Sequence, residues 1–300
     1  MDAFISQRQV GRFALIGLAV SLALSSALGI ASAQEFYGTL KKINETNSIN
    51  IGHRDSSVPF SYYDEKKQPV GYAMDLCNKV VDEVKKVLKK PSLQVNYVMV
   101  NAQTRIPKVM DHSVDMECGS TTNTLGRQKQ VDFSAIYFTT GTRILSRKIA
   151  KAREIEDLQT KSVGVVGGST NERAIKTMIA SGKLKDVRLV VVKDYADGLA
   201  ALENSGVEAF ATDDIVLYGL LAKSRMKDDL EVVGRLLTYD PYGIMMRRDD
   251  SAFRLVVNAA LADVFRSGEI ENIYAKWFNP IGVPVSPLMK AGFALQALPE

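Results

Sequence analysis

The sequence is poor in the residues that most often form metal sites and catalytic dyads. Among 300 residues there are two histidines, His53 and His112, and two cysteines, Cys77 and Cys118. A zinc site needs three or four such ligands at short, regular spacings, and these four residues have no such spacing. Neither histidine has a serine or cysteine partner at a recognisable spacing for acid–base or nucleophilic chemistry. We therefore expect no metal, no cofactor and no enzymatic activity.

Long apolar runs and basic clusters are also scarce. After Ala33 no apolar run is long enough to cross a bilayer, so we expect a soluble mature chain. The formal charge of +4 falls only to +3 when Asp2, Arg8 and Arg12 are removed. The lysine pairs within residues 85–90 are typical of the solvent side of one helix, so we expect no nucleic-acid partner.

The N-terminal residues have the pattern of a secretory signal peptide. Arg8 and Arg12 precede a continuous apolar segment, and residues 31–33 (ASA) match the small-x-small pattern of a signal peptidase site. The alternative is an uncleaved anchor, because residues 13–30 approach the minimum spanning length of about 17 residues. The serines and the glycine within that segment make it a poor span, so we expect export and cleavage after Ala33.

Export makes the cysteines informative, because disulfides persist in oxidising compartments. Cys77 lies on a predicted helix, and Cys118 ends a predicted strand that this helix could cover. A disulfide between them and two buried free thiols are both consistent with the sequence.

Apolar periodicity predicts two similar series of strands and helices. In the first, strands are expected at 48–55, 93–100 and 113–118, separated by helices at 71–90 and 105–112. The second begins with the strand, glycine turn and helix of residues 161–182 and continues in the same alternation to about residue 224. This alternation indicates two α/β lobes, each with a mainly parallel sheet covered by helices.

Two extended segments, 139–148 and 242–250, flank the second series and are expected to cross between the lobes. Paired hinge strands of this kind allow one lobe to close on the other around a ligand. The predicted organisation is a signal peptide at 1–33, lobe 1 at 34–140 and 241–300, and lobe 2 at 141–240.

Ligands of open α/β sheets bind outside the carboxyl ends of the strands. The segment ECGSTTNTLGRQKQVDFS, residues 117–134, follows such a strand. Ser120 and Thr122 offer hydroxyl and backbone N–H donors there, and Arg127 lies five residues after Thr122, where it could clamp a carboxylate. The alternative is an ordinary surface arginine after a capped turn.

Lobe 2 offers an anion site and a candidate counter-ion. Glycines precede a helix start at Ser169 or Thr170, where free N–H groups favour anions, although the same residues form an ordinary helix cap. No lysine follows these glycines in the pattern of a phosphate-binding loop. Asp213 ends a predicted strand, so it either caps the next helix or pairs with an ammonium group.

Two more arginines, Arg54 and Arg105, are expected at strand ends. If Arg127 binds one carboxylate and Asp213 binds an ammonium group, these arginines are left for a second carboxylate. A zwitterion with an acidic side chain would satisfy all four residues.

The chain resembles a known family in several motifs. These are residues 53–76 (HRDSSVPFSYYDEKKQPVGYAMDL), RIP at 105–107, the segment at 117–134, GTRIL at 141–145 and YAKWF at 274–278. They are similar to periplasmic solute-binding proteins of the polar amino-acid ABC transporter class (family 3), and most of all to its glutamate/aspartate-binding members. The resemblance covers essentially the whole mature chain.

This resemblance implies a two-lobed, type II (Venus-flytrap) binding protein without catalysis. It also implies a monomer in the periplasm that delivers its ligand to an ABC transporter permease in the inner membrane. At the matching positions, Ser120, Thr122 and Arg127 would hold the α-carboxylate and nearby amine, with Thr170 contributing from lobe 2. Asp213 would hold the α-ammonium group, and Arg54 and Arg105 the side-chain carboxylate.

Three positions depart from the family pattern. Ala73 replaces an acidic residue and concerns packing. Ala102 replaces a hydroxyl residue, and Tyr195 stands where close relatives have a histidine that reaches the side-chain carboxylate. Because the last two bear on the side-chain pocket, Tyr195 joins the predicted ligand-binding residues.

The predicted function is therefore the substrate-binding component of an amino-acid importer that takes L-glutamate or L-aspartate. Alternatives on the same fold are a receptor for glutamine or asparagine, a dicarboxylate receptor, and an exported dehydratase. The ligand-sensing domain of a signalling receptor would need a membrane span and an output module. We expect a freely diffusing receptor instead, since no output module follows residues 276–280.

Overall fold

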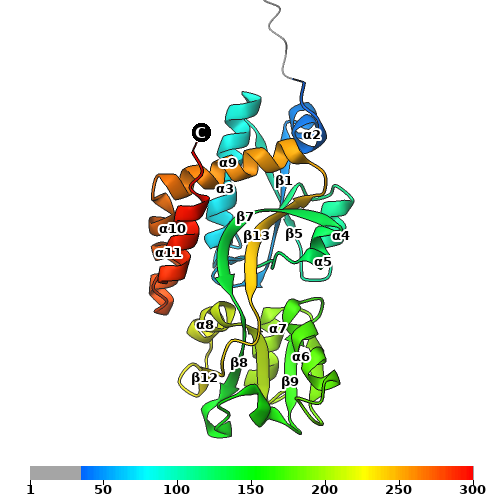
Figure 1. Cartoon of the computed structure of the whole chain (residues 1–300), viewed down its shortest axis with the longest axis vertical. Coiled ribbons are helices and arrows are strands. Elements are labelled where there is room, and N and C mark those ends of the chain that lie inside the picture. Colours follow the sequence, from blue (N-terminus) through cyan, green and yellow to red (C-terminus); the bar gives the residue numbers. More distant parts are fainter. Residues whose placement is uncertain (1–34, 300) are drawn as a thin grey trace, which may run out of the picture. The chain divides into compact units, whose positions relative to one another are not determined.

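The computed structural model describes residues 35–299 (Figure 1). The predicted signal peptide and its cleavage site lie outside the described residues. Tyr37–Glu300 form one compact unit, and the description below concerns that unit alone. Within residues 35–299, no helix combines the length and the apolar character needed to cross a membrane.

One five-stranded sheet is built from two distant parts of the chain. In spatial order it contains β5 (Gln94–Met99), β1 (Ser48–His53), β6 (Met116–Cys118), β13 (Asp240–Arg247) and β7 (Val131–Thr140). β1 pairs in parallel with β5 and β6, whereas β13 runs antiparallel to β6 and β7. The predicted parallel arrangement therefore holds for the first three strands. β7 and β13 are antiparallel to each other, because β7 carries the chain out of this sheet and β13 brings it back.

The second five-stranded sheet is formed by the middle of the chain. Its order is β10 (Arg188–Val192), β9 (Ser162–Val166), β11 (Ala209–Asp213), β8 (Thr142–Arg147) and β12 (Leu230–Val233). β9 pairs in parallel with β10 and β11, and β8 is antiparallel to β11 and β12. A small antiparallel sheet of β2 (Ser56–Ser57), β3 (Ser61–Tyr63) and β4 (Pro69–Val70) lies in the loop after β1.

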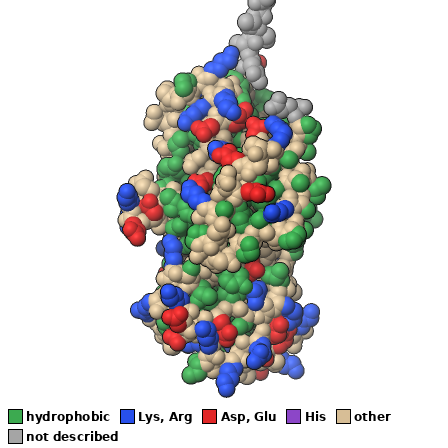
Figure 2. Space-filling view, turned by 90° about the vertical axis from the view of Figure 1, so that its left-hand side faces the viewer, with side chains coloured by type: hydrophobic (Ala, Val, Ile, Leu, Met, Phe, Trp, Pro, Cys, Tyr) green, Lys and Arg blue, Asp and Glu red, His purple; other side chains and the backbone are tan. Residues whose placement is uncertain are grey.

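Helices cover both large sheets (Figure 1). Around the first sheet lie α2 (Gly38–Thr46), α3 (Tyr72–Leu88), α4 (Arg105–Met110), α5 (Leu125–Gln128), α9 (Ser251–Arg266), α10 (Glu269–Phe278) and α11 (Pro287–Gln296). Around the second lie α6 (Thr170–Ala180), α7 (Tyr195–Glu203) and α8 (Asp214–Lys223). Charged side chains of both signs are interspersed with hydrophobic ones on the face shown in Figure 2.

The two crossings between the sheets lie side by side. β7 continues into β8 through Gly141, and the chain returns between β12 and β13, over residues 234–239. A side chain at Gly141 would place its Cβ 2.1 Å from the Thr238 carbonyl oxygen, so glycine allows the two crossings to touch.

The prediction that residues 242–250 form the second crossing was wrong. Residues 242–247 of that stretch belong to β13, which pairs with β7 from Asp240 opposite Thr140 to Arg247 opposite Val131. Its apolar side chains are buried in the first sheet, so the crossing must precede them.

We propose that the first sheet with its helices is lobe 1 and the second with its helices is lobe 2, with the boundaries expected from the sequence. Their cores differ in composition. An aromatic cluster in lobe 1 joins Phe60, Tyr72, Phe138, Tyr242 and Phe278, with neighbouring ring centroids about 5 to 6 Å apart. A core cluster in lobe 2 is aliphatic, with Ile144, Val163, Val165, Ile175 and Ala211 among its members.

Candidate ligand-binding site

The strand ends of lobe 1 gather at one edge of the sheet. Arg54 directly follows β1, and Ser120 follows β6 at a neighbouring position, because the two strands are parallel and adjacent. The expectation that Arg105 ends a strand was wrong, since β5 stops at Met99 and Arg105 opens α4. The Asn101 side chain accepts hydrogen bonds from the next turn, at Gln103 N and Thr104 N, and this turn leads into α4.

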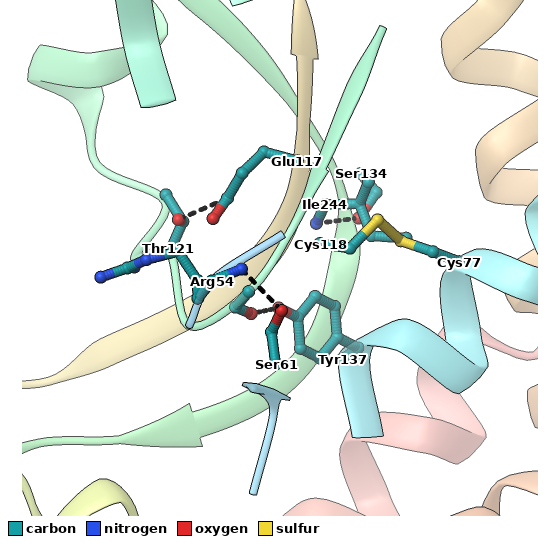
Figure 3. Close-up of a disulfide and its surroundings, with 10 residues drawn as sticks. Arg54, Ser61, Cys77, Glu117, Cys118, Thr121, Ser134, Tyr137 and Ile244 are labelled. Atoms are coloured by element: carbon teal, nitrogen blue, oxygen red, sulfur yellow. Dashed lines mark hydrogen bonds between the residues drawn. A yellow bond between two sulfur atoms is a disulfide. The ribbon is translucent and has the colours of Figure 1, made fainter. Parts of the chain in front are cut away.

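Arg54 is fully buried, with a relative exposure of 0%. Its backbone N donates to Ser61 Oγ at 2.9 Å (Figure 3), and its Cζ lies 5.3 Å from the centre of the Tyr195 ring. All three guanidinium nitrogens lack a hydrogen-bond acceptor among residues 35–299. Because an unpaired buried charge is costly, this side chain is suited to an incoming anion.

A hydrogen-bond relay holds Arg105. Its Nη1 donates to Thr121 Oγ1 at 2.7 Å. Figure 3 shows the second bond, in which the Thr121 hydroxyl donates to Glu117 Oε2 at 2.6 Å. Arg105 Nε and Glu117 Oε1 have no partner among the described residues. Burial lowers the pKa of Arg105, and the nearby Arg54 charge lowers it further, while Glu117 opposes both effects.

Arg127 is buried rather than on the surface, which excludes the alternative of an ordinary surface arginine. Thr124 caps the short α5 by accepting from Arg127 N, and the guanidinium turns back so that Nη1 donates to Thr122 O at 2.7 Å. Its Nη2 lies 3.4 Å from Gly168 O in lobe 2. Burial lowers the pKa of Arg127 to about 9, with the Arg105 charge contributing.

The loop of Ser120 and Thr122 contacts both lobes. Thr122 forms an isolated β-bridge with Tyr242 of β13, and its Oγ1 donates at 3.0 Å to Oδ1 of Asp240, the first residue after the return crossing. Thr122 Oγ1 also lies 3.3 Å from Thr170 Oγ1, and Ser120 Oγ lies 3.1 Å from the Tyr195 hydroxyl. The loop therefore joins the start of β13 to the first residues of α6 and α7 in lobe 2.

Thr170 and Tyr195 are the first residues of α6 and α7. The capping residue of α6 is Ser169, whose side chain accepts from Glu172 N at 3.0 Å, which leaves the Thr170 hydroxyl free to face Thr122. In the same way Asp194 caps α7 by accepting from Asp197 N, so the Tyr195 hydroxyl can reach Ser120.

Asp213 does not cap α8 with its side chain, although it occupies the capping position. Asn171 Nδ2 donates to its Oδ1 at 2.8 Å, and the Tyr242 hydroxyl donates to its Oδ2. Burial raises the pKa of Asp213 to about 7, and the charge of Asp240 adds to the shift. This environment, in which two donors hold a buried carboxylate, favours the counter-ion role over helix capping.

His53 is a packed residue and not the strand-end surface residue that it could have been from the sequence. It is 2% exposed, its Nδ1 donates to Arg54 O at 3.0 Å, and its Nε2 accepts from the Tyr63 hydroxyl at 3.3 Å. Burial lowers the pKa of His53. Its ring thus fixes the backbone from which Arg54 projects.

Cys77 of α3 and Cys118 of β6 form a disulfide, so of the two possibilities that the sequence left open the structure contains the bond (Figure 3). The bond ties the helix to the strand end that carries the site. Next to it, the Tyr137 hydroxyl donates to Gly119 O. A Cβ at Gly119 would lie 2.5 Å from Glu117 Oε1 and 2.9 Å from Arg54 Cγ, so glycine allows these two side chains to pack together.

The eight predicted ligand-binding residues therefore lie in one polar region between the two sheets, where all are buried except the half-buried Thr170. Their contact with a ligand stays a prediction. Sequence reasoning missed four residues that hold them, namely Glu117, Asn171, Asp240 and Tyr242. An acidic residue inside a short apolar strand was the available signal for Glu117. Among residues 35–299, no group of three or more histidine, cysteine, aspartate or glutamate side chains could hold a metal ion.

Known proteins are similar to this chain in sequence and in fold. Residues 49–280 match the family model of bacterial extracellular solute-binding proteins, family 3. The L-glutamate/L-aspartate-binding protein of Pseudomonas aeruginosa is 46% identical over 274 residues, which cover 91% of this chain and 89% of the relative. The glutamate/aspartate import solute-binding protein of Escherichia coli is 40% identical over 269 residues, which cover 89% and 88% of the two chains.

Solved structures support the same fold. The L-cysteine solute receptor of Neisseria gonorrhoeae superimposes with a TM-score of 0.73 at 23% identity, over 83% of this chain and 98% of that one. The names of the relatives in Pseudomonas aeruginosa and Escherichia coli describe binding and import, not catalysis, which confirms the expectation that the chain is not an enzyme. The chain belongs to family 3 of the bacterial extracellular solute-binding proteins.

Proposed function

We propose that the chain is the substrate-binding component of an amino-acid ABC importer and that it binds L-glutamate or L-aspartate between its lobes. One observation carries the proposal: lobe 1 presents the buried, unpaired guanidinium of Arg54 near Arg105 and Arg127, and lobe 2 presents the buried carboxylate of Asp213. Three cationic groups and one anionic group suit a ligand with two carboxylates and one ammonium group.

Each charged group is assigned one part of the ligand. Arg127 binds the α-carboxylate together with Ser120 and Thr122, because the bond from its Nη1 to the Thr122 carbonyl oxygen holds the guanidinium over the loop that carries these hydroxyls. Asp213 binds the α-ammonium group. The side-chain carboxylate goes to Arg54 and Arg105, whose guanidinium groups include buried nitrogens without an acceptor among residues 35–299.

Tyr195 is assigned to the side-chain end of the pocket. Its ring lies against Arg54 and its hydroxyl reaches Ser120, so it closes over the arginine from lobe 2. A tyrosine there adds a cation–π contact that holds the guanidinium flat while leaving its edge for a carboxylate. Ala102 is 7% exposed and supplies no side-chain donor, so the arginines carry most of the recognition.

Binding proceeds in two steps in this proposal. Lobe 1 first takes the ligand through its arginines, and lobe 2 then closes and brings Thr170, Tyr195 and Asp213 to it. The ligand favours the closed arrangement only through contacts that the open one lacks. The names of the relatives, which include an import protein, support delivery to a permease in the inner membrane. A monomer in the periplasm, cleaved after Ala33, is part of the same proposal and rests on the sequence pattern of residues 1–33 and the family resemblance.

Calorimetric titration of ligand-free protein tests the proposal. The chain from Gln34 onward would be unfolded, stripped of bound ligand, refolded and titrated with L-glutamate, L-aspartate, L-glutamine, L-asparagine, succinate and glutarate. We expect tight binding of L-glutamate or L-aspartate and binding of the neutral amino acids that is weaker by about two orders of magnitude, because a buried arginine would then lack its carboxylate. Preference for an amide would contradict the assignment of Arg54 and Arg105, and binding of dicarboxylates alone would contradict that of Asp213.

A further inference from the structure

Gly219 lies inside α8, at a point where lobe 2 meets the backbone of lobe 1. A Cβ at this position would be 2.6 Å from the Val58 carbonyl oxygen and 2.9 Å from the Val58 carbonyl carbon. The φ angle of Gly219 is not in the left-handed region, so its helical backbone would accept any ordinary residue. The close approach of Val58, and not the backbone conformation, is therefore what requires a glycine here.

Neither side of this contact can move aside by itself. On the lobe 1 side, Val58 N donates to Ser56 O at 3.0 Å, Phe60 N donates to Ser57 O at 2.8 Å, and Tyr72 N of α3 donates to Pro59 O at 2.9 Å. The loop that carries Val58 is thus tied to itself and to α3.

On the lobe 2 side, α8 is held to the start of β8 and to its neighbours in the sheet. Asp214 N donates to Gly141 O at 2.9 Å, and Arg143 Nη1 donates to the Tyr218 hydroxyl at 2.8 Å. Because both partners are anchored in their own lobes, extra volume at Gly219 would be relieved by moving the lobes apart at the hinge.

Such a movement would loosen the contacts between the lobes at the ligand site. The Thr122–Thr170 and Ser120–Tyr195 hydroxyl pairs and the Arg127 Nη2 to Gly168 O bond measure 3.3, 3.1 and 3.4 Å. These lengths are near the upper limit for a hydrogen bond, so a separation of about half an ångström would weaken all three.

We propose that Gly219 is a positioning residue for ligand capture: because it has no side chain, α8 can reach the Val58 backbone, and this contact sets how far lobe 2 closes. This inference rests on the proposed function, since it concerns the closure that brings Thr170, Tyr195 and Asp213 to the ligand. Gly219 itself does not touch the ligand in this proposal.

The test is the substitution Gly219→Ala, with L-glutamate as the probe. We expect its affinity to fall about ten- to a hundredfold, mainly through faster dissociation, because overpacking of the closed state acts against lobe closure. The melting temperature of the ligand-free variant should stay equal or rise, because alanine is a better helix former than glycine. X-ray scattering at saturating L-glutamate should give a larger radius of gyration than for the wild type.

Two matched glycine-to-alanine variants calibrate the effect. A Cβ at Gly167 would meet the side-chain Nε2 of Gln103 at 2.8 Å and a Val191 methyl group at 2.9 Å, so Gly167→Ala should have a smaller effect because those side chains can move. A Cβ at Gly292 in α11 would meet nothing within 4 Å, so Gly292→Ala should bind L-glutamate like the wild type.

Each other outcome is decisive. Unchanged affinity and dissociation rate in Gly219→Ala would overturn the proposal. Loss of stability or of folding in the ligand-free variant would overturn it too, because the contact would then be permanent packing and not part of closure. Failure of the wild-type protein to bind L-glutamate would instead contradict the proposed function, which keeps the two results distinguishable.

Discussion

The two lobes contribute to the site in opposite ways. Lobe 1 supplies three buried arginines, of which Arg54 has no protein acceptor for any guanidinium nitrogen among the described residues. Lobe 2 supplies Asp213, whose two oxygens already accept from Asn171 and Tyr242. From this difference we infer that lobe 1 selects the anionic groups of the ligand and that lobe 2 completes the site once the ligand is bound to lobe 1.

Their scaffolds differ accordingly. The site loop of lobe 1 begins at a disulfide, Cys77–Cys118, and lies beside an aromatic cluster that includes Phe138 of β7 and Tyr242 of β13. The core cluster of lobe 2 is aliphatic, and its site residues start helices. If lobe 1 is rigid and lobe 2 moves as one body, the ligand would bind to lobe 1 first and lobe 2 would then close on it.

Removal of the Arg127 side-chain charge should cause the largest loss of ligand affinity. In Arg127→Met we expect binding of every amino acid to fall by about three orders of magnitude, because the variant loses the charge that holds the α-carboxylate common to all of them. Arg188→Met, which changes an exposed arginine of β10, is the matched control and should bind normally. Calorimetry that detects full binding in Arg127→Met would contradict the assignment.

Removal of the disulfide should weaken lobe 1 selectively. The bond links residues 41 apart, and closing a loop of that length stabilises a fold by about 2 to 4 kcal/mol. We expect the double variant Cys77→Ser, Cys118→Ser to lose about that much unfolding free energy in urea titrations. Hydrogen exchange should rise first in β6 and α3, and equal rises in β9 and β11 would argue against a selective role.

Acid should weaken binding through Asp213. Its pKa of about 7 in the folded protein lies above the ordinary value of 3.8, because burial disfavours the charged form. The α-ammonium group needs the charged form, so affinity should fall about tenfold per pH unit below 7 and level off above it. Titrations between pH 5 and 8 measure this slope, and a flat profile would contradict the counter-ion role.

The same shift predicts the opposite trend for the ligand-free protein. In the interval between the two pKa values the unfolded chain has released the Asp213 proton and the folded chain retains it, so stability should decrease as pH rises from about 4 through about 7. Asp213→Asn cannot titrate, and its contribution to this slope should vanish. Comparing the urea unfolding of the two proteins at pH 5 and pH 7.5 tests the prediction.

Loss of the hydrogen-bond relay from Arg105 through Thr121 to Glu117 should have the smallest effect on stability and ligand binding. Thr121→Val keeps the side-chain shape but leaves Arg105 Nη1 and Glu117 Oε2 without their hydroxyl partner. We expect a loss of about 1 to 3 kcal/mol in stability and a weaker hold on acidic ligands. Thr121→Ser retains the hydroxyl, so it should restore both properties, whereas equal losses in the two variants would show that shape and not the relay matters.

Much of the lobe 1 half of the site could be predicted from the sequence, because its residues follow strand ends that apolar periodicity locates. Arg54 after β1 and Ser120 after β6 are examples. Arg105 was predicted as a strand-end residue, which was wrong; it opens α4, and the turn at Asn101 leads from β5 into this helix.

Contacts between distant segments could not be predicted in this way. Periodicity shows which face of an element is buried, but it does not show which elements meet. The Tyr242 hydroxyl reaches Asp213 from the other sheet, and Gly219 meets Val58 across 161 positions of sequence. The second crossing was misplaced for the same reason, because β13 looks like any extended segment until its pairing with β7 is known.

The most direct test of the account is a comparison of L-glutamate and L-glutamine binding in the wild type and in Arg54→Met, by calorimetry at pH 7.5. The two ligands share their α-groups and differ only at the side-chain end, where Arg54 is assigned. The account predicts that the substitution weakens L-glutamate binding by about a hundredfold and L-glutamine binding far less. Equal losses for the two ligands would contradict the claim that Arg54 recognises the side-chain carboxylate.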